Sequence, residues 1–251
     1  MNFLAELGLA KEAARTAGEF LQYVADGTVE SSLGRDIKLR EDREAERIIL
    51  DLLRARSDYP ILAEESGIST PERDGLRWIV DPLDGSYNYY RGMRDWCAVS
   101  IALWDGEQPI LGVVNKFHTD ELYEGLIGYG AFLNGRSIAP SSATELSQAV
   151  CATGLSIKGG FDARRLEEYI QLFQVFKKVR MLGSASIMSV YVGAGKVDVY
   201  QEKDILLWDI AAGTAISLAA GVEAEIVIKD GYRCDVTLFA NERLKCDYVN
   251  S

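Results

Sequence analysis

The chain of 251 residues contains one histidine, His118, and only four cysteines. A lone histidine is usually a structural or surface residue, and it excludes any site that needs a histidine pair. The cysteines, at positions 97, 151, 234 and 246, are widely spaced and form no CxxC pair, so they give no zinc-binding spacing. We expect them to be reduced, buried thiols.

Long apolar runs and excess basic charge are also missing. No uninterrupted apolar run reaches about 18 residues, the length of a membrane-spanning helix. The first residues, MNFLAELGLAKEAARTAGEFL, include acids and lack the basic start and apolar core of a signal peptide. The formal net charge of −11 argues against non-specific attraction to nucleic acid. We therefore expect a cytoplasmic enzyme with small-molecule, metal or protein partners, and neither nucleic acid nor membrane.

The composition, 48% hydrophobic and 26% charged, is that of a globular protein with a sizeable core. The sequence has no internal repeat and no low-complexity tract. The stretch APSSAT, near residue 140, marks a division into an N-terminal half (1–140) and a C-terminal half (141–251).

Apolar periodicity predicts the secondary structure coarsely. Residues 3–24 and 41–56 have the three-to-four spacing of amphipathic helices, and the polar stretch GTVESSLGRD between them predicts a mobile loop. Residues 60–135 contain six short apolar runs separated by glycine and aspartate, which predict a largely antiparallel sheet. The second half alternates: helices near 163–177, 184–194 and 208–220, with strands at KVDVYQ and AEIVI.

The segment IVDPLDGS places Asp81 and Asp84 directly after an apolar run. Pro82 bars helical geometry at Asp81, so the turn can aim both carboxylates one way. Two close carboxylates repel unless a cation compensates them, and Mg²⁺ prefers oxygen ligands, to which the Leu83 carbonyl could add. A helix opening at Gly85 and Ser86 would suit a phosphate. The alternative is an Asx-turn and helix cap.

Two further acidic positions follow or interrupt apolar runs. Glu64 and Glu65 end the run ILAEE, where a charged pair is usually solvated surface. Asp209, in LLWDIAAG, has apolar neighbours on both sides and therefore needs a partner. A shared metal centre would supply that partner.

Together these segments resemble the inositol monophosphatase family. The similar motifs are DPLDGSYN at 81–88, EES at 64–66, WDIAAG at 208–213, GSAS at 183–186 and DIKLRED, with Asp36 and Asp42 six residues apart. Glu202 stands seven residues before Asp209, as in the family. The resemblance implies an α+β fold, an alternating αβαβα layered sandwich, and Mg²⁺-dependent, lithium-sensitive hydrolysis of a phosphate monoester, usually in a homodimer.

The resemblance also implies a role for each site residue. Glu64, Asp81 and the Leu83 carbonyl would hold one Mg²⁺, and Asp81, Asp84 and Asp209 a second; a third ion, when present, would lie near Glu64. The hydroxyl of Ser86, with Asp42, would orient the attacking water beside Glu64. The remaining substrate contacts would come from Gly85, Ser86, Ser184, Ala185, Glu202 and Asp209. The sequence departs from the family in having Arg35 where a loop lysine is common, and Ser86 in place of threonine.

Several alternatives stay open. Inositol phosphate or a similar sugar phosphate is the first choice of substrate, with fructose 1,6-bisphosphate next; DGSYN lacks the lysine typical of the branch acting on 3′-phosphoadenosine 5′-phosphate. A different class of function is regulation by binding the transcription machinery. The chain lacks the Cys-to-Arg spacing of cysteine phosphatases, and GAGK at 193–196 lacks the Ser or Thr of a P-loop.

Overall fold

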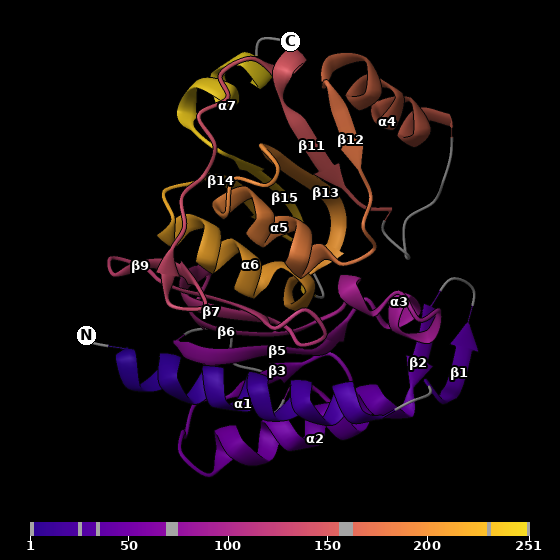
Figure 1. Ribbon diagram of the computed structural model, residues 1–251, viewed down its shortest axis with the longest axis vertical. Coiled ribbons are helices and arrows are strands. Elements are labelled where there is room, and N and C mark those ends of the chain that lie inside the picture. The colour runs from indigo at the N-terminus through magenta and orange to yellow at the C-terminus, as the bar shows by residue number, and fades with distance from the viewer. Residues whose placement is uncertain are drawn as a thin grey trace.

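The protein is described by a computed structural model that covers residues 3–24, 27–33, 36–68, 75–155, 163–229 and 232–249. Helices and sheets alternate in five layers (Figure 1). From the bottom of that view these are a helix pair, an eight-stranded sheet, a second helix pair, a five-stranded sheet and two outer helices. The layered α+β fold predicted from the sequence is therefore confirmed.

The first helix layer consists of α1 (Leu4–Tyr23) and α2 (Arg40–Arg54), which pack against each other and against the first sheet. Both helices were predicted from their apolar spacing, and both are confirmed with ends shifted by one or two residues. In α1 the alanines of the buried face, among them Ala10, Ala14 and Ala17, are fully buried. Small side chains on this face let the helix lie close to the sheet.

The first sheet has the strand order β10-β9-β8-β7-β6-β5-β3-β4. All neighbouring strands are antiparallel except β3 and β5, as the predicted, largely antiparallel sheet requires. Its strands are β3 (Ile61–Ala63), β4 (Gly67–Ile68), β5 (Leu76–Asp84), β6 (Ala98–Asp105), β7 (Gln108–Lys116), β8 (Glu121–Leu126), β9 (Gly130–Leu133) and β10 (Arg136–Ser137).

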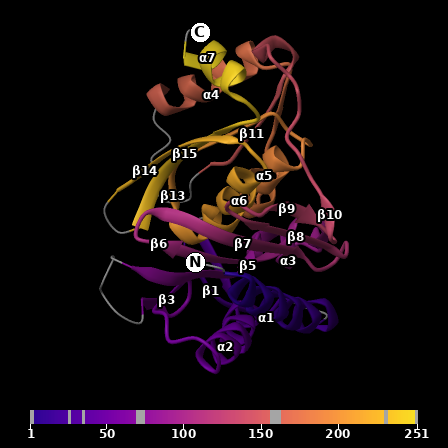
Figure 2. The same cartoon turned by 90° about the vertical axis from the view of Figure 1, so that its left-hand side faces the viewer.

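The central helices, α5 (Ala185–Gly193) and α6 (Leu207–Ala219), lie between the two sheets (Figure 2). A Cβ on Gly112 of β7 would come within 2.2 Å of the Ala212 carbonyl oxygen, so only glycine permits this close approach of α6 to the sheet. Both helices are buried on nearly every side, as expected for elements covered by sheets on two faces.

The second sheet has the order β12-β11-β13-β15-β14, and α4 (Ala163–Val175) and α7 (Glu242–Val249) lie beyond it. Its strands are β11 (Val150–Thr153), β12 (Lys178–Arg180), β13 (Val199–Leu206), β14 (Glu223–Ile228) and β15 (Arg233–Phe239). The helices predicted at 163–177, 184–194 and 208–220 and the two predicted strands are present. The division near residue 140 stays a prediction.

Some sequence-based expectations were wrong or incomplete. The predicted loop, residues 27–36, contains the strand β1 (Val29–Leu33), which pairs antiparallel with β2 (Asp36–Leu39). Both strands are largely polar, so their sequences lack the apolar alternation that would have indicated them. Arg35 lies outside the described residues. The strands β11, β12 and β15 and the helix α7 were not predicted.

The four cysteines are free thiols, and three of them are buried as expected. Cys246 is exposed, which corrects the expectation for that position. Across the described ranges, no helix combines the length and apolar character needed to cross a bilayer.

Candidate active site

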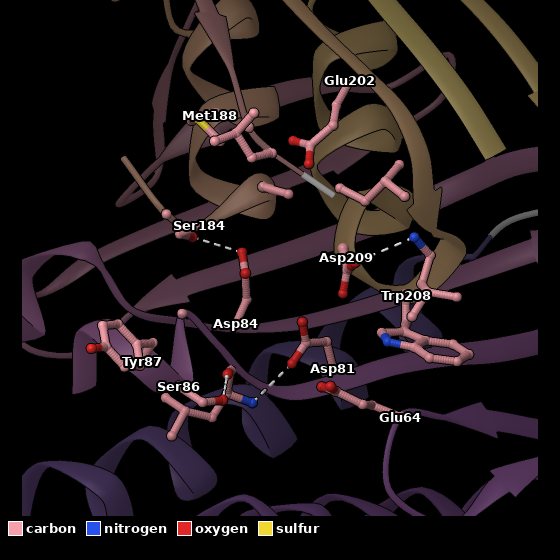
Figure 3. A pocket seen from close by; sticks show the side chains of 18 of the residues that line it. Glu64, Asp81, Asp84, Ser86, Tyr87, Ser184, Met188, Glu202, Trp208 and Asp209 are labelled. Atoms are coloured by element: carbon pink, nitrogen blue, oxygen red, sulfur yellow. Dashed lines mark hydrogen bonds between the residues drawn. The ribbon is translucent and has the colours of Figure 1, made fainter. Parts of the chain in front are cut away.

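A cavity of about 310 Å³ opens where β5, α5, α6 and the end of β13 meet (Figure 3). It brings together most of the residues singled out in the sequence. The lining includes Glu64, Asp81, Leu83, Asp84, Gly85, Ser86, Ser184, Ala185, Glu202 and Asp209. Asp42 does not line the cavity, but it accepts a hydrogen bond from the hydroxyl of Ser86, which does. Segments separated by more than a hundred residues thus form one polar site.

The turn after the apolar part of β5 directs its two aspartates as expected. The Leu83 amide donates to Oδ1 of Asp81 at 3.0 Å, which is the Asx-turn considered as an alternative. Gly85 follows with a φ of 89° and precedes the short helix α3 (Ser86–Tyr90). No side chain caps α3, so the helix-cap alternative is not seen. The turn leaves both carboxyl groups facing the cavity.

Asp84 connects the first sheet to the central helices. Its Oδ2 accepts hydrogen bonds from the Ser184 hydroxyl at 2.6 Å, from the Ser186 amide at 2.7 Å and from the Ser186 hydroxyl. Ser184 also caps α5, because its Oγ accepts from the Ile187 amide. Ser186 was not predicted to be a site residue, although it is the second serine of the GSAS motif that includes Ser184. These contacts join Asp84, at the end of β5, to the start of α5.

Glu64 and Asp209 complete the group of carboxyls from opposite sides. Glu64 follows β3, and its amide donates to the Val80 carbonyl at 3.2 Å. Asp209 lies in the first turn of α6, where its Oδ2 accepts from the Leu206 amide at 3.3 Å. In Figure 3 both side chains point toward Asp81. Four acidic side chains therefore face one space.

Burial and mutual repulsion disfavour ionisation of these carboxyls. Burial, with the nearby charges of Asp42 and Glu65, raises the pKa of Glu64 to about 8. The pKa values of Asp81 and Asp209 are raised well above the usual range by burial and then by neighbouring carboxylates. Burial also raises the pKa of Asp84, against the hydrogen bonds from the serines. Such a group stays charged at neutral pH only beside a cation.

Asp42 and Ser86 form a small hydrogen-bonded unit at the edge of the cavity. The Ser86 Oγ lies 2.9 Å from the Leu83 carbonyl oxygen and 3.1 Å from Oδ1 of Asp42, while Oδ2 of Asp42 accepts from the Leu39 amide at 2.8 Å. Burial raises the pKa of Asp42 to about 7. A hydroxyl has only one proton to donate. The protonation state of Asp42 therefore decides whether Ser86 donates to Asp42 or to the Leu83 carbonyl oxygen.

Glu202 lies at the opposite side of the cavity on β13. Its Oε2 accepts from the Tyr200 hydroxyl at 3.0 Å. A Cβ on Gly154 would come within 2.3 Å of that oxygen, so glycine there makes room for the carboxylate. Gly154, Lys38, Tyr87, Trp208 and Asp204 also line the cavity and were not predicted. Lys38, Tyr87 and Trp208 stand within the motifs DIKLRED, DPLDGSYN and WDIAAG, which could have indicated them. Gly154 and Asp204 stand in none of these motifs.

The donor set can be compared with the needs of a divalent cation. Hard cations such as Mg²⁺ take carboxylate and carbonyl oxygens, and the raised pKa values show buried acids without enough compensating charge. Within the described residues, no three or more His, Cys, Asp or Glu side chains are yet gathered closely enough to hold a metal. Asp84 and Asp209 are held by the serines and the Leu206 amide. The carboxylate and carbonyl oxygens of this set therefore fit a divalent cation in kind.

The chain is similar to several known proteins. Residues 6–245 match the inositol monophosphatase family. An inositol-1-monophosphatase of Rhizobium meliloti is 40% identical over 189 residues, which are 74% of this chain and 70% of that protein. A Nus factor SuhB of Xylella fastidiosa is 36% identical over 196 residues, 77% of this chain and 67% of that protein.

A solved structure of inositol monophosphatase from Anabaena shows the same fold. It superposes with a TM-score of 0.84 and 29% identity, covering 100% of this chain and 96% of that one. Similarity therefore extends over both sheets and all the elements that build the cavity. The chain belongs to the inositol monophosphatase family.

Proposed function

We propose that this protein hydrolyses a phosphate monoester with the help of Mg²⁺, and that inositol monophosphate or a similar sugar phosphate is its substrate. The observation that carries the proposal is the convergence of Glu64, Asp81, Asp84 and Asp209 on one cavity. Their raised pKa values indicate a need for positive charge. The sequence similarity to an inositol-1-monophosphatase supports the choice of substrate.

Glu64, Asp81, the Leu83 carbonyl, Asp84 and Asp209 would hold two Mg²⁺ ions, with Glu64 near a third when it is present. When bound, the ions supply positive charge that stabilises the attacking and departing oxygens. The amides of Gly85 and Ser86 would hold the phosphate, and Asp209, Ser184, Ala185 and Glu202 would contact the substrate. Glu202 can accept a hydrogen bond from a substrate hydroxyl.

Asp42 and Ser86 would orient the attacking water, and Glu64 would accept its proton. When Asp42 is ionised, it can accept the Ser86 O–H across the 3.1 Å contact. The lone pairs of the Ser86 oxygen are then available to accept a hydrogen bond from water. Glu64, as an ionised carboxylate beside the cation, would take up the proton of that water.

Phosphate release from a panel of substrates tests the proposal. We expect Mg²⁺-dependent release from inositol 1-phosphate, to be compared with fructose 1,6-bisphosphate and 3′-phosphoadenosine 5′-phosphate. Asp81→Asn and Asp209→Asn should each lower turnover by about 10²–10³-fold, because each removes a charge from the reacting centre. Asp95→Asn, at an exposed residue, is the matched control. Undiminished turnover in either cavity variant would refute the mechanism.

A regulatory role in binding the transcription machinery is the second candidate, favoured by the similarity to a Nus factor. This role does not require hydrolysis. A cell in which the Asp81→Asn variant replaces the wild-type protein separates the two functions. Loss of the cellular effect together with hydrolysis supports the enzyme, whereas a surviving effect supports the binding protein.

We also propose a homodimer in the cytoplasm, inhibited by Li⁺. Support for association comes from α4, where Leu166, Ile170 and Phe173 are each about half exposed and recur three or four residues apart. The sedimentation velocity of the wild type and of Phe173→Asp checks this. A monomeric wild-type protein would contradict the dimer. Measuring the rate of hydrolysis at increasing Li⁺ concentrations checks the lithium sensitivity.

A further inference from the structure

The indole of Trp208 presents a hydrogen-bond donor to the cavity without an acceptor. Trp208 lies in the first turn of α6, next to Asp209, and lines the cavity. Its Nε1 is buried and has no hydrogen-bond partner among the described residues. In Figure 3 the indole nitrogen points toward the space between Glu64, Asp81 and Asp209.

Other buried indoles of this protein are paired. Trp78 donates to the Ser57 hydroxyl at 3.0 Å, and Trp104 donates to the Ala211 carbonyl at 3.3 Å. Both side chains are fully buried in the core, and neither lines the cavity. A buried donor left unpaired costs stability, so native proteins keep very few of them. The unpaired indole therefore calls for an explanation at this site.

Trp208 differs from the other residues with an unpaired buried atom because it lines the cavity. Thr214 and Glu41 also have a buried polar atom without a hydrogen-bond partner among the described residues, but neither residue lines the cavity. A neutral N–H beside carboxyls can hold an acceptor oxygen without neutralising the negative charge that a cation needs. A lysine or arginine at the same place would compete with that cation.

We propose that Trp208 donates its indole N–H to an oxygen atom that enters the cavity with its ligand. The acceptor is either a water molecule that accompanies Mg²⁺ or an oxygen of the phosphate group. This inference rests on the proposed function, and it makes Trp208 a ligand-positioning residue of the same site. An oxygen of the bound ligand would then give the indole N–H its acceptor.

Indole N–H resonances of protein labelled with ¹⁵N-tryptophan test the inference directly. The chain has four tryptophans, so the signal of Trp208 can be assigned by its loss in Trp208→Phe. If that variant does not fold, Phe variants of the other three assign it by elimination. We expect the Trp208 resonance to move downfield, and its exchange with solvent to slow, when ligand binds.

The two acceptors are separated by the order of addition. A shift with Mg²⁺ alone identifies water as the acceptor, and a shift only after inorganic phosphate is added identifies a phosphate oxygen. In Trp208→Phe, calorimetry should show about 3- to 10-fold weaker binding of the ligand that causes the shift, as expected for one lost hydrogen bond. Trp78→Phe removes an indole that does not line the cavity and should leave this affinity unchanged.

The results that would overturn the inference differ from those that would overturn the proposed function. An unmoved Trp208 resonance while calorimetry shows both ligands bound would overturn this inference alone. Wild-type protein that binds neither ligand would overturn both. Binding and the expected shift without hydrolysis of any substrate would uphold the role of Trp208 and overturn the enzymatic proposal.

Discussion

At the scale of single residues, Gly85 sets the direction of the turn between Asp84 and Ser86. Its φ of 89° is in the region that favours glycine, and a Cβ there would come within 2.7 Å of the Trp96 carbonyl oxygen. We expect Gly85→Ala to lower the free energy of unfolding by about 1–3 kcal/mol through backbone strain, with a further loss from this contact. Urea unfolding measures the effect.

The matched control for Gly85 is Gly128, which has a similar φ of 81° but no atom within 4 Å of an added Cβ. Gly128→Ala should therefore show only the cost of the left-handed backbone, about 1–2 kcal/mol. Gly85→Ala should in addition lower phosphate release, because the turn carries two site residues. Equal loss of stability in the two variants would show that the contact with Trp96 contributes nothing.

At the scale of elements, α2 holds the turn that carries Glu64. The buried carboxylate of Glu46 accepts from the Glu65 amide at 2.8 Å and from the Ser66 amide at 3.0 Å. In Glu46→Gln one acceptor oxygen becomes an NH₂ group that faces an N–H donor. We expect a loss of about 1–3 kcal/mol in unfolding free energy and a higher half-saturating Mg²⁺ concentration for hydrolysis.

Glu41 provides the control on the same helix. It is fully buried, and its Oε2 accepts from the Thr28 amide at 2.9 Å, a bond that a glutamine oxygen can keep. Glu41→Gln should leave the Mg²⁺ dependence near that of the wild type. An equal rise of the half-saturating Mg²⁺ concentration in both variants would contradict this prediction. It would mean that the negative charge of α2 governs cation binding, and not the hydrogen bonds from Glu46 to the turn.

The sequence predicted the elements whose signals are local. The helices at 3–24 and 41–56 were found because their apolar spacing lies within each segment, and the Asp81 turn because Pro82 and Gly85 stand beside it. The contacts of Glu46 and Ser186 join segments that are 19 to 102 residues apart, so no local pattern contains them. The unpaired indole of Trp208 likewise becomes visible only in the folded cavity.

At the scale of the whole molecule, a charged cluster joins the first sheet to the central helix layer. Glu121 of β8 pairs with Lys116 of β7 and, at 2.7 Å, with Lys196, which follows α5. The Tyr123 hydroxyl and the Thr119 hydroxyl also donate to Glu121, at 2.9 and 3.1 Å. The cluster therefore connects elements from both halves of the chain.

This cluster predicts a pH dependence of stability. Burial alone would raise the pKa of Glu121, but the hydrogen bonds and charges of Lys116 and Lys196 outweigh it and lower the pKa from 4.5 to about 2. A carboxyl with a lowered pKa in the folded state stabilises the protein above its unfolded pKa, and this contribution is lost as the pH falls toward about 2. Glu121→Gln should therefore be less stable than the wild type at pH 7.

The difference in unfolding free energy between the wild type and Glu121→Gln should narrow as the pH falls below about 4.5, because protons then bind the unfolded carboxyl first. Urea unfolding of both proteins between pH 7 and pH 3 measures this. If the difference in unfolding free energy stays constant with pH, Glu121 stabilises the protein through packing. The ion pairs of Glu121 with Lys116 and Lys196 then add no stability.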